Sequence, residues 1–194
     1  MDFSILLSLL AGITQVIGYM FYWRGVRSGK IDPNAASWFI WAYGSLLNFA
    51  TYNIMSGDMV KDILPFMCSV SCMVIFALMV YRNGIGRLDK IDYAIIASDI
   101  AVTFIWFLIG ATEANLTLQL TEFISFIPLI RGLLRGTDKE EILPWVIWTC
   151  AYAMMTFTVI MRWEKWEDIV YPLMSLFLSL IIWIVIKVKN LSNR

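Results

Sequence analysis

The chain has 194 residues, of which 60% are hydrophobic and 15% charged, and its formal net charge is zero. Soluble domains carry about a quarter charged residues, so this composition favours a membrane protein. A net charge of zero gives no indication of a nucleic-acid partner. The chain has no histidine, which excludes histidine metal ligands and histidine-based catalytic pairs. We therefore expect no enzyme activity, no metal site and no cofactor.

Seven apolar stretches are long enough to cross a bilayer as helices, which takes about 20 residues. The first has no basic region before it and no small-residue cleavage site after it, so we interpret it as a retained span rather than a signal peptide. The fifth is the most polar, because Thr117, Gln119, Thr121 and Glu122 lie in its first half. The predicted spans are Phe3–Trp23, Ala36–Met55, Val60–Tyr81, Ile91–Gly110, Leu116–Leu134, Leu143–Met161 and Ile169–Val188.

Basic residues are concentrated on one side of these spans. Of the 15 Lys and Arg residues, three (Lys61, Arg162 and Lys165) lie on one side and the other 12 on the opposite side. Loops rich in Lys and Arg stay in the cytoplasm. The distribution predicts a protein of the cell (inner or plasma) membrane with its N-terminus outside and its C-terminus in the cytoplasm. The larger group consists of Arg24, Arg27, Lys30, Arg82, Arg87, Lys90, Arg131, Arg135, Lys139, Lys187, Lys189 and Arg194.

The stretch SWFIW, residues 37–41, is similar to PWVIW, residues 144–148, at an offset of 107 residues (145 − 38). Without a gap, this offset pairs 13 identical residues over the 70 positions from Thr14 to Asn83. Such regularity indicates a duplication. The pairs are Thr14/Thr121, Ile17/Ile124, Arg24/Arg131, Gly25/Gly132, Gly29/Gly136, Trp38/Trp145, Ile40/Ile147, Trp41/Trp148, Thr51/Thr158, Pro65/Pro172, Met67/Met174, Ile75/Ile182 and Asn83/Asn190.

The duplicated unit contains three spans, so two units insert in the same direction only if a further span separates them. We therefore predict an all-α integral membrane protein with seven transmembrane helices. Residues 1–83 form the first three-helix repeat, residues 84–112 contain the linker helix, and residues 113–194 form the second repeat. Transporters built from parallel repeats bind their substrate near the midplane, between the repeats.

This 3+1+3 plan, with its topology and size, resembles the SWEET and PQ-loop transporter family. The proline in FIPLIR, residues 126–131, occupies the place where a Pro breaks the first helix of a repeat in that family, and LLNFATY, residues 46–52, is similar to its second helix. The Pro-Gln dipeptide itself is absent from both repeats. The tryptophan that SWEETs place against sugar corresponds to Thr51 and Thr158. The resemblance implies alternating-access transport and does not imply sugar as the substrate.

Several polar residues inside the predicted spans are candidates for a substrate site. Gln15 and Glu122 occupy equivalent places in the two repeats and should face each other across the pseudo-two-fold axis, unless Glu122 lies at the outer interface. Asn48 and Tyr52 share one helical face and either bind substrate or join helices. The full set of predicted substrate-binding residues is Gln15, Tyr19, Asn48, Thr51, Tyr52, Glu122 and Thr158.

The remaining candidates concern coupling and gating. Asp99 lies in the middle of the linker span, where a carboxylate is either functional or a hydrogen-bonding link between helices. Asp99 and Glu122 are the candidates for proton or ion coupling. The candidate gate and hinge residues are Trp41, Trp148, Pro128, Arg24 and Arg131. For the tryptophans the alternative is the aromatic belt of the membrane interface, and for the arginines it is the setting of topology.

These observations predict a transporter or facilitator for a small polar molecule, such as a sugar, an amino acid or a vitamin-like solute. The few inward-facing charges favour a neutral or zwitterionic substrate. The alternative is a seven-helix receptor or scaffold subunit that transports nothing. The expected partners are the small-molecule substrate and the lipid bilayer, and a homo-oligomer is left open.

Overall fold

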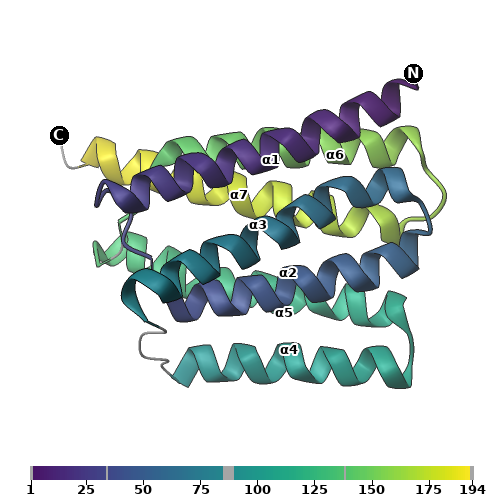
Figure 1. Ribbon diagram of the computed structural model, residues 1–194, viewed down its shortest axis with the longest axis horizontal. Helices are drawn as coiled ribbons and strands as arrows, with labels where there is room; N and C mark the ends of the chain where they lie inside the picture. The colour runs from purple at the N-terminus through teal and green to yellow at the C-terminus, as the bar shows by residue number, and fades with distance from the viewer. Residues whose placement is uncertain (1, 34, 85–89, 138, 193–194) are drawn as a thin grey trace.

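The computed structural model describes residues 2–33, 35–84, 90–137 and 139–192, and every regular element in these ranges is an α-helix (Figure 1). The helices are antiparallel to their neighbours in sequence, so the two chain ends lie at opposite ends of the bundle. The all-helical prediction is confirmed. The helices are α1 (Phe3–Arg27), α2 (Ala35–Ser56), α3 (Met59–Asn83), α4 (Lys90–Leu108), α5 (Ala111–Arg135), α6 (Ile142–Met161) and α7 (Glu167–Ser192).

Local sequence accounts for where several helices begin and end. Asp2 and Asp58 cap α1 and α3, because their carboxylates accept hydrogen bonds from the backbone N–H groups of Ser4 and Val60 at 3.1 and 2.9 Å. The α5 helix ends at Gly136, whose φ of 77° is the left-handed conformation that glycine adopts most readily. The predicted and observed spans differ most at the start of α5, which begins at Ala111 rather than Leu116. The polar first turns of α5 are helical because their buried amide side chains bond to α2.

Among the described residues, five helices are long and apolar enough to cross a membrane: α1, α3, α5, α6 and α7. The α2 helix carries Asn, Tyr and Trp side chains that lower its hydropathy, and several of them, including Trp38, Asn48 and Tyr52, are buried in the bundle. In α4 the apolar stretch, Tyr93–Leu108, is shorter. Large apolar side chains such as Met20 and Phe107 are exposed on the outer surface, as expected where lipid is the solvent. The described part of the chain is thus all-helical, with five candidate membrane-spanning helices.

The helices pack as two groups with α4 at one edge (Figure 1). In the first group α3 contacts both α1 and α2, and in the second group α7 contacts both α5 and α6. The groups meet where α1 packs on α6 and where α2 packs on α5. The α4 helix packs against α5 and α2. The interface between the groups therefore runs through the centre of the bundle.

Candidate functional site

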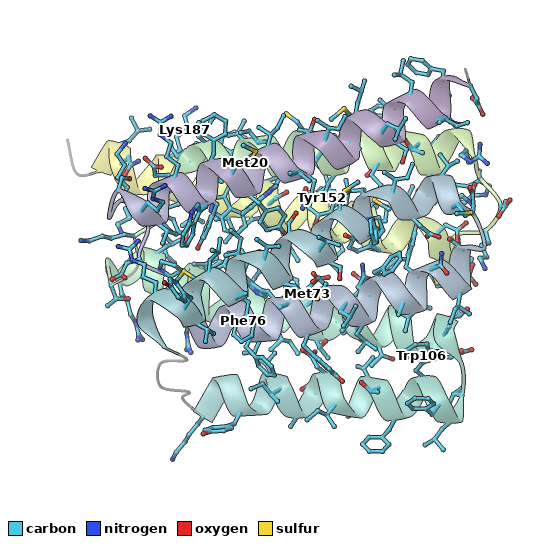
Figure 2. The ribbon with its side chains drawn as sticks, in the orientation of Figure 1. Met20, Met73, Phe76, Trp106, Tyr152 and Lys187 are labelled. Carbon is cyan, nitrogen blue, oxygen red and sulfur yellow. The ribbon has the colours of Figure 1, made fainter. Side chains whose placement is uncertain are left out.

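A cavity of about 790 Å³, including the space at its mouth, lies between the two helix groups. All seven helices contribute side chains to its lining, and Tyr152 of α6 is among them, near the centre of the bundle (Figure 2). Gln15 and Glu122, from the middle of α1 and α5, both line it, as do Tyr19 and Asp99. The structure therefore brings four of the predicted substrate-binding and coupling residues together at one place.

Six aromatic side chains form a closed ring in the cavity wall, which we call the aromatic ring. Its members are Tyr19, Trp38, Trp41, Phe126, Trp145 and Trp148. In that order, and returning to Tyr19, the ring centroids are 6.1, 5.1, 6.0, 6.1, 5.0 and 4.9 Å apart. These spacings fall within the range of roughly 4.5–7 Å that favourable aromatic pairs adopt. Adding 107 to the first three residue numbers gives the last three.

Hydrogen bonds and close packing hold the tryptophans of α6 in the aromatic ring. The Trp148 indole N–H donates to the backbone carbonyl of Gln15 at 3.2 Å. A Cβ atom at Gly18 would overlap the Trp148 indole, so only glycine lets this ring lie against α1. The Trp145 indole N–H donates to Glu140 Oε2 at 3.0 Å, and the hydroxyl of Tyr22 donates to the other oxygen of that carboxylate at 3.2 Å. The aromatic ring is thus fixed from both helix groups.

The wall formed by α4 and α5 is acidic. Asp99 Oδ1 accepts a hydrogen bond from the Thr121 hydroxyl at 3.2 Å, and the carboxylate of Glu122 lies one residue further along α5. The Glu122 Oε2 atom is buried without a hydrogen-bond partner. None of the described residues that line the cavity is a lysine or an arginine. The lining therefore presents carboxylates with no basic side chain to pair with them.

Other buried polar atoms in the cavity also lack partners. The Gln15 side chain donates weakly to the Tyr152 hydroxyl at 3.4 Å, but its carbonyl oxygen accepts from no group in the described chain. Trp38 Nε1 and Ser175 Oγ are unpartnered as well. Buried polar groups are nearly always hydrogen-bonded, so a cluster of unpartnered ones on a cavity wall suits a polar ligand.

A pair of thiols on α3 also lines the cavity. Cys68 and Cys72 lie one turn apart on α3, and their sulfur atoms are 3.2 and 3.0 Å from the Tyr19 hydroxyl. The residues at the same offset of 107 are Ser175 and Ser179 of α7, which line the cavity too. None of these four was predicted, because small side chains within apolar runs look like lipid-facing residues. The repeat offset, applied to small polar residues, is the signal that would have found them.

The structure places the other predicted substrate residues outside the cavity lining. Asn48 Oδ1 accepts from the side chains of Asn115 and Gln119, each at 3.0 Å, in a buried network between α2 and α5. Thr51 accepts from Asn115 at 3.0 Å and belongs to the same network. The Thr158 hydroxyl donates within α6, to the carbonyl of Met154. Asn48 and Thr51 therefore join α2 to α5, which was the alternative interpretation for Asn48, whereas the Thr158 bond stays within α6.

The predicted gate residues fall into two locations. Trp41 and Trp148 belong to the aromatic ring, on the cavity wall. Arg24 and Arg131 are exposed near the ends of α1 and α5. Pro128 lies within α5, and its side chain is outside the described part of the structure.

A cluster of ion pairs, which we call the clasp, joins the groups at the end of the bundle where α3 and α7 begin (Figure 1). Lys61 Nζ is 2.7 Å from Asp168 Oδ2 and 3.2 Å from Glu164 Oε2, and both side chains of the first pair are 0% exposed. The hydroxyl of Tyr52, a predicted substrate residue, donates to the backbone carbonyl of Asp168 at 2.7 Å. Lys61 and Asp168 are themselves 107 positions apart.

A second, partly exposed part of the clasp lies beside this buried pair. Arg162 Nε is 2.5 Å from Asp58 Oδ2, and Arg162 Nη1 is 3.3 Å from Asp2 Oδ2. Burial opposes ionisation of Asp58, but hydrogen bonds from Arg162 and from the Val60 N–H outweigh it and lower the pKa of this carboxyl. The same pairing raises the pKa of the Arg162 guanidinium. Both groups are therefore charged at neutral pH.

Comparisons of the chain with protein-family models, with curated proteins and with solved structures found no match.

Proposed function

We propose that the protein is a membrane transporter or facilitator of a small polar molecule, working by alternating access between two three-helix units. The observation that carries this proposal is the cavity itself. It lies between the two helix groups and has side chains from all seven helices in its lining, including buried polar atoms that lack partners. Concave sites that are mostly apolar, with a few polar groups, are the usual form of small-molecule sites.

The helix contacts support the arrangement in two parallel units with α4 as the linker. In the two proposed repeats, the helices α1, α2 and α3 of the first are equivalent to α5, α6 and α7 of the second. The contacts of α3 with α1 and α2 then correspond to those of α7 with α5 and α6, and the contact between α1 and α6 corresponds to that between α5 and α2. On this plan, which is similar to that of the SWEET family, all seven helices span the membrane. The basic end of the bundle faces the cytoplasm.

The difference between the two ends of the bundle supports the alternating movement. The clasp holds one end with a buried ion pair, whereas the pair between Lys30 and Glu141 at the other end has side chains that are 67% and 32% exposed. The cavity begins about two turns, or about 10 Å, from the clasp, as judged from Lys61 and Cys68 on α3. Rocking of the units would break the clasp and expose the cavity to that side. Asp99 and Glu122 are the candidates for proton or ion coupling, because both line the cavity.

Reconstituted transport tests this function. The full chain in liposomes should take up radiolabelled solutes from a small panel of sugars, amino acids and organic cations, and Trp148→Ala should abolish uptake. Trp163→Ala, an exposed tryptophan outside the helices, is the matched control and should leave uptake unchanged. Solute binding without flux would refute the transporter and favour a receptor or a scaffold subunit.

A further inference from the structure

We infer, resting on the proposed transport function, that the cavity selects a monovalent organic cation. The charged group would lie between the acidic wall (Asp99 and Glu122) and the faces of the aromatic ring. The chemical class is a compact ammonium or iminium ion that carries at least one further polar group. This differs from the neutral or zwitterionic substrate that the sequence favours.

The acidic wall carries the first part of this inference. Asp99 comes from α4 and Glu122 from α5, so two separate helices direct carboxylates to one cavity. Asp99 is 3% exposed, and its contact in the described structure is with the neutral hydroxyl of Thr121. Carboxylates away from water are unfavourable without a partner, and a bound cation supplies one.

The aromatic ring supplies an independent reason for a cation. The π face of an aromatic side chain carries partial negative charge, and tryptophan attracts cations most strongly. Four of the six members of the aromatic ring are tryptophans, and Phe126 lies one turn after Glu122 on α5. Aromatic faces and carboxylates on adjoining walls favour the same charge.

The lining also discriminates against a negatively charged group. A zwitterion would bring a carboxylate into a cavity whose described lining contains no basic side chain. Lys61 has a place in the clasp, about 10 Å away along α3. An anionic group would thus be left without a partner, close to two carboxylates.

The unpartnered neutral groups define what else the ligand carries. Gln15 is 1% exposed, and its free carbonyl oxygen suits a hydroxyl or N–H donor on the ligand. Trp38 Nε1, also 1% exposed, suits an acceptor. The Ser175 hydroxyl can serve as either. An organic cation with a hydroxyl or carbonyl group satisfies these atoms, whereas an inorganic ion satisfies the carboxylates alone.

Binding of matched cations and neutral molecules tests the inference. The purified full chain is titrated calorimetrically with choline and with its neutral isostere 3,3-dimethylbutan-1-ol, with 3-(hydroxymethyl)-1-methylpyridinium and with its neutral isostere 3-methylbenzyl alcohol, and with the zwitterion glycine betaine. We expect at least one cation to bind roughly tenfold or more tightly than its neutral counterpart and than betaine. If neither cation binds more tightly than its neutral counterpart, the inference is overturned.

A variant pair shows whether the acidic wall is responsible. Glu122→Gln keeps the size of the side chain and should weaken cation binding roughly tenfold while leaving the affinity for neutral molecules unchanged. Glu113→Gln makes the same change at an exposed position of α5 and should bind like the wild type. Equal cation binding in both variants would overturn the role of Glu122. If Glu122→Gln does not fold, the wild-type selectivity still decides.

Flux separates this inference from the proposed function. Liposomes that take up a neutral solute but no cation would leave the transporter in place and overturn the cation selectivity. Selective cation binding with no flux would overturn the transporter and leave the cation selectivity in place. Failure of both binding and flux across the panels would overturn both.

Discussion

Removing the Lys61 ammonium should destabilise the protein more than any other single charge removal in the clasp. In Lys61→Met the Asp168 carboxylate, 0% exposed and 2.7 Å from the lost ammonium, remains buried without its partner. Breaking a buried ion pair from one side costs about 3–5 kcal/mol. At about 1.4 kcal/mol per factor of ten, the folded population falls by roughly two to nearly four orders of magnitude relative to the unfolded one.

A double-mutant cycle measures the pair itself. Lys61→Met combined with Asp168→Leu replaces the ion pair by apolar side chains of similar size, and such replacements are often close to neutral. The double variant should therefore recover most of the lost stability, with a coupling free energy of about 2 kcal/mol or more. The assay is reversible unfolding in mixed micelles, followed by tryptophan fluorescence.

The exposed ion pair at the other end of the bundle is the matched control for this cycle. Lys30→Met and Glu141→Leu remove a pair whose side chains are 67% and 32% exposed, and its coupling should stay within about 1 kcal/mol. Equal coupling energies for the two pairs, or additive effects at Lys61 and Asp168, would refute the view that burial makes the ion pair of the clasp the stronger of the two.

Three further predictions concern other contacts. Gly18→Ala should displace the indole of Trp148, quench or shift tryptophan fluorescence, and weaken ligand binding; an unchanged spectrum and affinity would contradict the packing. Asn115→Leu should lower the free energy of unfolding by about 1–3 kcal/mol, because it removes the buried hydrogen bonds that Asn115 donates to Asn48 Oδ1 and to Thr51 Oγ1 on α2. Because the pKa of Asp58 is lowered in the folded protein, its stabilising effect is present above its ordinary pKa of 3.8 and is lost as the pH falls below that value. Asp58→Asn should reduce the change of the melting temperature between pH 5 and about pH 3. A pH dependence equal to that of the wild type would show that Arg162 does not stabilise the carboxylate.

The positions of the helices could be predicted from the sequence because they depend on the length of apolar runs. The predicted start of the first helix, Phe3, and the predicted end of the sixth, Met161, are the observed ones. The sequence places the start of α5 five residues late, at Leu116, because the polar side chains before this residue are typical of a loop. Their amide groups are satisfied by α2, and hydropathy contains no information about a partner on another helix.

The inward face of each helix was harder to predict. Asn48 and Tyr52 share a face, as expected, but they bond to α5 and to the backbone of α7 instead of lining the cavity. Gln15 and Glu122 line it. All four are polar residues within apolar helices, and hydropathy does not distinguish a link between helices from a ligand group. Their repeat equivalence is what separates them: Gln15 and Glu122 have a polar counterpart at the offset, whereas Asn48 and Tyr52 have Met155 and Val159.

On the duplication we propose, the clasp is an arrangement that becomes available when two similar units are joined in one chain. In a symmetric dimer of identical three-helix chains, equivalent positions carry the same residue, so a lysine at this place would meet another lysine across the axis. Here one position is Lys61 and its counterpart is Asp168, and the pair attracts. Gln15 and Glu122 differ in the same way, so that of these two equivalent positions only the one on α5 carries an acidic side chain. Under the duplication we propose, fusion let each half diverge separately, so that a ligand can be held in one orientation rather than in two equivalent ones.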